Sequence, residues 1–403
     1  MLTTAGFQLF ENPRADRATP YDAKGRADIL SLAAFADAKR EITSWPGYQP
    51  TPLRRLSKLA AAAGVGDILY KDESGRFGIG SFKALGGAYA VLRLLRQDIR
   101  TRTGKLVTSQ DLLSSRYRDL TQRITVTGAT DGNHGRSVAW GARLFGCRCV
   151  IYIHQTVSEG RARAIASYGA EVRRAKGTFD DAVRRCGADA AANGWYEVSD
   201  TAYEGYTEVP RDVMQGYSLM AEEAMAQTPV VPTHVFVQGG VGGLAAGVCS
   251  YLWERFRTNR PRYIVVEPAK ADCIYRSAMA GRPTPAEGSL DTIMAGLACG
   301  EVSLLAWRIL EVGADAFITV GDEAAADCMR LLADGRFGDA PLVAGESAVA
   351  GLAGMLLASA DADARRRLDL TSDSVALVFG TEGATDPELY RSIVGRSPEQ
   401  VAG

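Results

Sequence analysis

Short runs of β-branched and aromatic residues alternate with helical segments through the last two thirds of the chain. The first four runs are ITVTG (124–128), CVIYI (149–153), EVRRA (171–175) and WYEV (195–198). A second series consists of HVFVQ (234–238), YIVVEP (263–268), AFITV (316–320) and SVALVF (374–379). Because strands that alternate with helices are joined by crossovers, each series predicts a parallel sheet. We therefore expect an α/β protein with two open, twisted, mostly parallel sheets and a cleft between them.

The composition is that of an ordinary soluble protein with room for two domains. The 403 residues are 46% hydrophobic and 23% charged. Lys plus Arg, at 46, nearly balance Asp plus Glu, at 47, so the net charge gives no reason to expect a nucleic acid or a membrane as partner. The polar, arginine-rich segment 99–123 is interpreted as a solvated insertion without function.

The cysteines and the N-terminal residues bear on location and metal binding. The seven cysteines form no CxxC pair and no HExxH motif is present, so we expect neither a disulfide framework nor a metal site. The first residues lack a basic segment followed by a long apolar core, and no later run is long enough to span a membrane. The sequence therefore predicts a cytoplasmic protein.

One lysine has unusual neighbours. Lys83 stands in SFKALGGAYA, among apolar and small residues. A lone lysine near the start of a helix is normally a surface cation. Apolar surroundings, however, are expected to depress its pKa and so to free the amine for Schiff-base chemistry. The two glycines that follow, Gly86 and Gly87, would let another group approach the backbone closely.

A tight turn joins a strand to a helix in TGATDGNHG (127–135). Asp131, Gly132 and Asn133 are good turn and cap residues and need no further role. Ligands of open α/β sheets nevertheless bind at such turns, and the amide of Asn133 could donate to a ligand oxygen. The three histidines, His134, His154 and His234, are expected to be structural.

A glycine run follows the strand HVFVQ. Four of the five residues 239–243 are glycine, and a helix comes next, which is the arrangement of a phosphate cradle. The same stretch matches GxGxxA, and Glu267 ends the next strand where a ribose ligand would stand, so a nicotinamide-dependent dehydrogenase is an alternative. That alternative leaves Lys83 and the asparagine turn unexplained. A ligand with an aldehyde, a ring hydroxyl and a phosphate, namely pyridoxal 5′-phosphate, accounts for all three.

These motifs also support a family resemblance. SFKALGG, TDGNHGRSVAW, GGVGGL and LVFGTEG together resemble the fold-type II pyridoxal-phosphate enzymes, the threonine dehydratase and tryptophan synthase β group. DTAYEGYTEVPRDVMQGY (200–217), EPAKADC (267–273), DTIMAGLACGE (291–301) and GTEGATD (380–386) are similar to the diaminopropionate ammonia-lyase family. Ser137, where a glycine is more usual, is a mild departure. The resemblance implies a homodimer, with residues 1–86 and 206–403 in a large cofactor-binding domain and 87–205 in a small one.

The resemblance implies a role for each motif. Lys83 would hold the cofactor as a Schiff base, and Asn133 would contact the ring hydroxyl oxygen. Thr381 would face the pyridine nitrogen, where a neutral hydroxyl favours elimination over long-lived carbanion chemistry. The phosphate would be held by Gly239, Gly240, Gly242 and Gly243.

The implied reaction is α,β-elimination of 2,3-diaminopropionate, as the L- and also the D-isomer, to pyruvate and two ammonia. A relative acting on serine, threonine or another β-substituted amino acid is the alternative. Asp131 and Asp200 are the expected catalytic acids, because a cationic substrate favours carboxylates and a second base would admit the D-isomer. Their competing interpretations are a helix cap for Asp131 and a turn residue for Asp200.

Three further residues are candidates at the edge of the site. Cys273 and Cys299 stand in two of the family-like segments and are expected to lie near each other, although two ordinary thiols are the default interpretation. Glu346, in GESAVAGL, would either approach the cofactor ring or cap the helix that follows.

Overall fold

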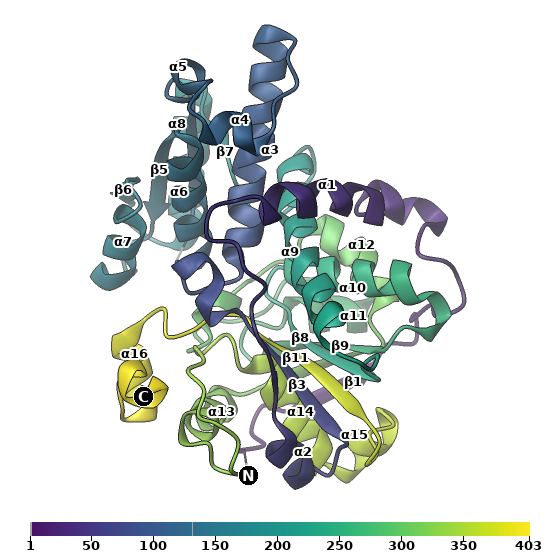
Figure 1. Cartoon of the computed structure of the whole chain (residues 1–403). Coiled ribbons are helices and arrows are strands. Elements are labelled where there is room, and N and C mark those ends of the chain that lie inside the picture. Colours follow the sequence, from purple (N-terminus) through teal and green to yellow (C-terminus); the bar gives the residue numbers. More distant parts are fainter. Residues whose placement is uncertain (1, 131) are drawn as a thin grey trace.

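The computed structural model describes residues 2–130 and 132–403, and their strands form two separate sheets (Figure 1). The smaller sheet is wholly parallel, and the larger is parallel except for its two edge strands, which pair antiparallel. In spatial order the larger sheet consists of β1 (Gln8–Glu11), β10 (Ala316–Val320), β9 (Arg262–Pro268), β8 (His234–Gln238), β11 (Val375–Gly380), β3 (Asp67–Asp72) and β2 (Leu53–Arg55). The smaller consists of β6 (Glu171–Arg174), β5 (Arg148–Ile153), β4 (Thr125–Ala129) and β7 (Tyr196–Glu197).

The two predicted strand series therefore form the two sheets. Sequence reasoning missed the strands of the first 72 residues, β1, β2 and β3, of which β3 lies beside β11 within the larger sheet.

Alternate residues of the larger sheet face two hydrophobic cores. On β8, Val235 and Val237 belong to one core and Phe236 to the other, as the two-residue period of a strand requires. The first core contains helices α1 (Leu32–Thr43), α9 (Glu208–Gln227), α10 (Gly243–Phe256), α11 (Cys273–Ala280) and α12 (Leu304–Gly313). The second contains α2 (Ser57–Ala63), α13 (Asp322–Asp334), α14 (Ala350–Ala360), α15 (Ala362–Arg367), α16 (Pro387–Val394) and α17 (Pro398–Ala402).

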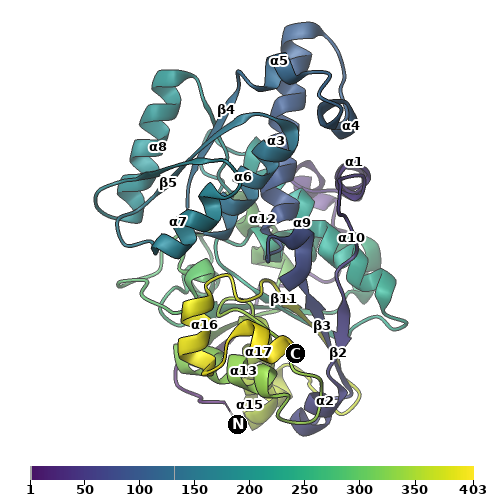
Figure 2. The ribbon, with the colours of Figure 1, turned by 60° about the vertical axis from the view of Figure 1, so that its left-hand side comes forward.

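The smaller sheet is covered in the same manner (Figure 2). Val150 and Tyr152 of β5 pack against α8 (Phe179–Asn193), and Ile151 faces the opposite core. That core contains α3 (Lys83–Thr103), α6 (Asn133–Phe145) and α7 (Glu159–Ala166). The short helices α4 (Ser109–Leu113) and α5 (Arg118–Thr121) lie in the arginine-rich segment, and short 3-10 turns are η1 (Ala23–Asp28), η2 (Glu73–Gly78), η3 (Arg257–Asn259) and η4 (Ala295–Leu297).

Helix α3 links the two sheets, since it packs against both α6 and α9. A Cβ on Gly86 would lie 2.5 Å from the Tyr217 ring of α9, and one on Gly87 would lie 2.3 Å from Ser137 Oγ of α6. The groups that approach the backbone at these two glycines are therefore protein side chains. Ser137, the departure noted in the sequence, donates a hydrogen bond of 2.6 Å to the Lys83 carbonyl oxygen.

The division into a large domain (1–86 and 206–403) and a small one (87–205) stays a prediction. It is supported by strand membership, since all strands of the smaller sheet lie between residues 125 and 197. Among the described residues, no helix has both the length and the apolar character that a membrane span needs.

Candidate active site

Lys83 is the first residue of α3. Its ammonium forms an ion pair with a carboxylate that follows β7, an edge strand of the smaller sheet. Its Nζ atom is 2.6 Å from Oδ2 of Asp200, which follows β7, and each side chain is 18% exposed. The rings of Phe82 and Tyr217 have centroids 5.4 and 5.6 Å from Nζ. The structure thus joins two sequence-predicted catalytic residues in one ion pair.

The electrostatics of Lys83 differ from the sequence expectation. Burial lowers the pKa of Lys83, but the attraction of Asp200, with smaller contributions from Tyr217 and Cys299, outweighs it and raises the net pKa well above its usual range. The pKa of Asp200 is held well below its usual range, because Lys83 and then His134 outweigh the effect of burial. The predicted depressed lysine pKa was therefore wrong, because the sequence did not show that Asp200 would stand beside the amine.

The asparagine turn contacts the segment that follows β11. Asn133 begins α6, and its Nδ2 donates to the carboxylate of Glu382. The cap position of α6 is occupied by Gly132, which has no side chain to cap it. Asp131 falls outside the described residues, so its predicted catalytic role is carried forward untested.

The end of β11 closes the site from the larger sheet. Thr381 is buried, and its carbonyl oxygen accepts a hydrogen bond of 3.0 Å from the backbone N–H of Phe82. This bond fixes the strand end beside the start of α3 and therefore beside Lys83.

Two buried carboxyl groups lie next to this strand end. Burial and the neighbouring Glu382 raise the pKa of Glu346 to about 8, and burial also raises that of Glu382. Arg161 of α7 reaches Glu346 and Asp386, each at 3.4 Å from one of its guanidinium nitrogens. Glu346 does not cap α14, which begins after Val349 without a side-chain cap. Arg161, from a helix that covers the smaller sheet, therefore binds carboxyl groups attached to the larger sheet.

The glycine run forms an open helix end. Gly240 and Gly242 have φ of 61° and 94°, a region that favours glycine, and no side chain caps α10. Amides at such a helix start suit an anion. A Cβ on Gly243 would lie 3.8 Å from the Tyr217 ring and 3.9 Å from the Asp200 carbonyl oxygen. The run is therefore next to the lysine site.

The two cysteines singled out in the sequence flank this run. Cys273 Sγ lies 3.7 Å from the Gly240 carbonyl oxygen, and a Cβ on Gly240 would lie 3.8 Å from Cys299 Sγ. Cys299 also contributes to the electrostatic environment of both Lys83 and Cys273.

Glu267 does not lie where a nicotinamide ribose would need it. Its buried carboxylate accepts hydrogen bonds of 3.1 and 2.7 Å from the backbone N–H groups of Ile274 and Tyr275, at the start of α11. A Cβ on Gly239 would lie 2.6 Å from the Glu267 side chain. Because Glu267 closes a helix end, the dehydrogenase alternative loses the residue on which it depended.

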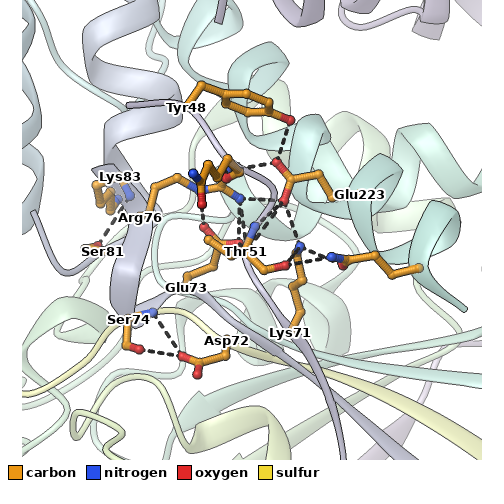
Figure 3. A network of polar contacts seen from close by, with 12 residues as sticks. Tyr48, Thr51, Lys71, Asp72, Glu73, Ser74, Arg76, Ser81, Lys83 and Glu223 are labelled. Carbon is orange, nitrogen blue, oxygen red and sulfur yellow. Dashed lines mark hydrogen bonds and ion pairs between the residues drawn. The ribbon is translucent and has the colours of Figure 1, made fainter. Parts of the chain in front are cut away.

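A buried polar network underlies the segment that leads into Lys83 (Figure 3). The Arg76 guanidinium binds Glu73 at 2.8 Å and Glu223 of α9 at 2.7 Å, and Lys71 binds Glu223 at 2.7 Å. Their side chains are at most 2% exposed, so this is a charge-balanced network of two cations and two anions. Thr51 supplies further hydrogen bonds.

Comparison with known proteins identifies the family. The model for "Pyridoxal-phosphate dependent enzyme" matches residues 44–380. Diaminopropionate ammonia-lyase of Escherichia coli (strain K12) is 43% identical over 367 residues, which are 88% of this chain and 90% of that protein. Its counterpart in Salmonella typhimurium (strain LT2) is 40% identical, covering 87% and 90%. The chain belongs to the diaminopropionate ammonia-lyase family.

Solved structures of this family agree with the fold. The holo diaminopropionate ammonia-lyase of Escherichia coli superposes with a TM-score of 0.88 at 37% identity, covering 98% of each chain. A second structure of that enzyme, with an aminoacrylate-PLP azomethine reaction intermediate, gives a TM-score of 0.85 at 38% identity. The chain is thus a fold-type II, pyridoxal-phosphate-dependent lyase, as predicted, and the nicotinamide alternative is discarded.

The residues present fit the family's cofactor. The N-terminus of α10 suits the phosphate, because Gly240 and Gly242 have positive φ and no side chain caps the helix. Lys83 would supply the amine, and Thr381 and Asn133 follow the ends of β11 and β4, which belong to different sheets.

Several site residues were not recognisable from the sequence alone. Glu382 stood in the quoted motif GTEG without an assigned role, and Tyr217 ended another such motif. Arg161 lies in an Arg-rich helix that resembles any solvated helix. Glu382 binds Asn133, 249 residues away, and Arg161 binds Glu346, 185 residues away. Tyr217 meets Gly86 of α3 only through packing, so no local pattern distinguishes these residues.

Proposed function

We propose that this lyase catalyses α,β-elimination of 2,3-diaminopropionate, in both its L- and D-forms. One water is consumed, and pyruvate and two ammonia are released. The proposal is carried by one observation: the Lys83–Asp200 ion pair stands beside the glycine run of a chain whose relatives are named for this activity. The D-isomer is included because Asp131, next to the Asn133 turn, could supply a second base.

Lys83 acts as the base on one face of the substrate α-carbon, and Asp131 on the other. Pyridoxal phosphate, when bound, supplies an electron sink for the electrons released at that carbon. Asp200 holds a proton at Lys83 Nζ and would orient the amine. Because the site is largely buried, these charges interact more strongly than they would in water.

The cofactor contacts follow the same arrangement. We assign the phosphate to the amides of Gly239, Gly240, Gly242 and Gly243. Thr381 would present its neutral hydroxyl to the pyridine nitrogen in place of a carboxylate. Asn133 has two amide hydrogens, so it can donate to the ring hydroxyl oxygen while the other hydrogen stays with Glu382.

Specificity for a diamino acid is supported by Asp200. Its pKa is held well below its usual range, so it is a carboxylate, and a carboxylate stabilises a substrate ammonium. A homodimer in the cytoplasm, as the sequence predicted, belongs to the same proposal.

A substrate panel tests the function. Purified holoenzyme is given L- and D-diaminopropionate, L- and D-serine and L-threonine, and pyruvate or 2-oxobutyrate and ammonia are measured. We expect two ammonia per pyruvate and the highest kcat/KM with diaminopropionate. A higher kcat/KM with D-serine would make the chain a dehydratase; the Escherichia coli lyase has been crystallised with D-serine, so this comparison is needed.

Borohydride reduction followed by peptide mapping tests the lysine separately. The label should be on Lys83, and Lys270, an exposed lysine paired with Asp322, serves as the internal comparison. A label on any other lysine would overturn the assignment of Lys83.

A further inference from the structure

His134 has one ring nitrogen fixed and the other directed at the catalytic ion pair. Its Nε2 lies 2.8 Å from the Val198 carbonyl oxygen, which requires a proton on Nε2. In the neutral ring Nδ1 is then an acceptor. Nδ1 is buried, finds no hydrogen-bond donor among the described residues, and lies 3.8 Å from Oδ2 of Asp200.

The Nδ1 lone pair of neutral His134 thus faces the carboxylate of Asp200. Asp200 Oδ2 is the same oxygen that lies 2.6 Å from Lys83 Nζ. The three groups therefore form a row, Lys83–Asp200–His134, with a total charge of zero when the lysine is an ammonium and the ring is neutral.

The row addresses a difficulty that the ion pair creates. Asp200 favours the ammonium form of Lys83, whereas bond formation to an aldehyde and removal of a proton from carbon both need the neutral amine. If the proton simply left, Asp200 would remain as a half-buried, unpaired carboxylate, which is costly.

We propose that His134 is the proton reservoir of the Lys83–Asp200 pair, taking up at Nδ1 the proton that Lys83 gives up. An N–H bond of Lys83 breaks, the proton passes along Asp200 Oδ2, and an N–H bond forms on His134. The row keeps its total charge of zero, because Lys83 becomes neutral as His134 becomes a cation. The reverse transfer restores the ammonium.

The electrostatic balance at the ring agrees with this assignment. Burial lowers the pKa of His134, Asp200 raises it and Lys83 lowers it further. Among the described residues these two are the charged groups that act on the ring. When the charge of Lys83 disappears, the attraction of Asp200 remains, so the ring gains affinity for a proton at that moment.

His234 is a built-in control. It is also buried, and its Nε2 also lies 2.8 Å from a carbonyl oxygen, that of Leu368. Its Nδ1, however, lies 2.7 Å from the hydroxyl of Thr233. Burial is the largest cause of the lowered pKa of both histidines, but Asp200 and Lys83 act on His134, whereas Arg262, Asp369 and Asp315 act on His234.

The inference rests on the proposed roles of Lys83 and Asp200, but its first test needs no substrate. The full chain, labelled with 13Cε1-histidine and freed of cofactor, is titrated by NMR, and the three histidines are assigned with His134→Gln and His154→Gln. In Lys83→Met the pKa of His134 should rise by about one to three pH units, and in Asp200→Asn it should fall. His234 should stay unchanged in both variants. An unchanged His134, or equal shifts at His134 and His234, would overturn the proposal.

A second measurement asks whether the proton is used. In His134→Gln the side chain can still donate to Val198 but cannot carry the proton, so Schiff-base absorbance after addition of pyridoxal phosphate should develop more slowly, on the order of 10²-fold at pH 7. The melting temperature should be close to that of the unmodified protein, which separates this effect from a folding defect. An unchanged rate would overturn the reservoir even if His134 titrates as expected. Production of pyruvate from diaminopropionate is judged separately, so the reservoir and the proposed substrate can fail independently.

Discussion

Lys83 and Asp200 form an ion pair of 2.6 Å although 117 residues separate them in the sequence. Asp200 follows the edge strand of the smaller sheet, and Lys83 begins the helix that packs against both halves of the molecule. Formation of this ion pair is therefore coupled to the packing of the smaller sheet against α3, and its loss should be visible in stability as well as in the proposed activity.

Asp200→Asn should lower the free energy of unfolding by about 2 kcal/mol at pH 7, because the variant loses a charge-assisted hydrogen bond. The folded-state pKa of Asp200 lies below its unfolded value. Its contribution is thus present above about pH 4 and is lost as the pH falls through the folded-state pKa. Urea denaturation at pH 3.5 and pH 7 should show a smaller difference between variant and parent at the lower pH. Asp373→Asn, at an exposed position, should change stability by less than about 0.5 kcal/mol.

Asp131→Asn should discriminate between the two isomers of the substrate. The amide keeps the size and polarity of the side chain but removes the base, so turnover of D-diaminopropionate should fall by about 10²- to 10⁴-fold while that of the L-isomer falls much less. Steady-state pyruvate formation with each isomer measures this. Equal losses would mean that Asp131 only orders its turn, and no activity of the unmodified enzyme on the D-isomer would remove the reason for a second base.

Arg76→Met should leave the network of Lys71, Glu73 and Glu223 with an uncompensated buried charge. We expect a loss of about 3–5 kcal/mol in the free energy of unfolding. The double variant Lys71→Met/Glu223→Gln is the matched control, because it removes one charge of each sign and leaves the Arg76–Glu73 pair intact. It should lose less than the single variant in the same urea titration. If the double variant loses as much, charge balance is not what stabilises this network.

Arg161→Ala should weaken the contact between α7 and the end of the larger sheet. Arg161 is 19% exposed and faces two carboxylates, so a loss of about 2 kcal/mol is expected. Because the pKa of Glu346 is raised to about 8, Glu346 loses its proton as the pH rises through that value and becomes a buried carboxylate. The variant lacks the guanidinium that would stabilise this carboxylate. The difference in the free energy of unfolding between variant and parent should therefore be larger at pH 9 than at pH 6.

Arg163→Ala, an exposed arginine on the same helix, is the control for this substitution and should stay within about 0.5 kcal/mol of the parent at both pH values. Equal losses for the two variants would attribute the effect to α7 itself and not to the bridge.

Local patterns were sufficient for the fold class. The alternation of strand and helix identified the parallel sheets, and the glycine run 239–243 marked an uncapped helix start, because both depend on residues that are close in sequence. The apolar setting of Lys83 likewise indicated a buried amine. The short strands β1 and β2 were missed, since edge strands of three or four residues carry little pattern of their own.

The protonation state of the amine depended on tertiary structure. Local sequence suggested a depressed pKa for Lys83, but the fold brings Asp200 to 2.6 Å and reverses the direction. The same holds for Asn133 with Glu382, and for Arg161 with Glu346, which meet only because segments attached to two different sheets pack together. A Coulomb interaction depends on distance in space and on burial, and for residues more than a hundred positions apart neither is present in the sequence until the chain has folded.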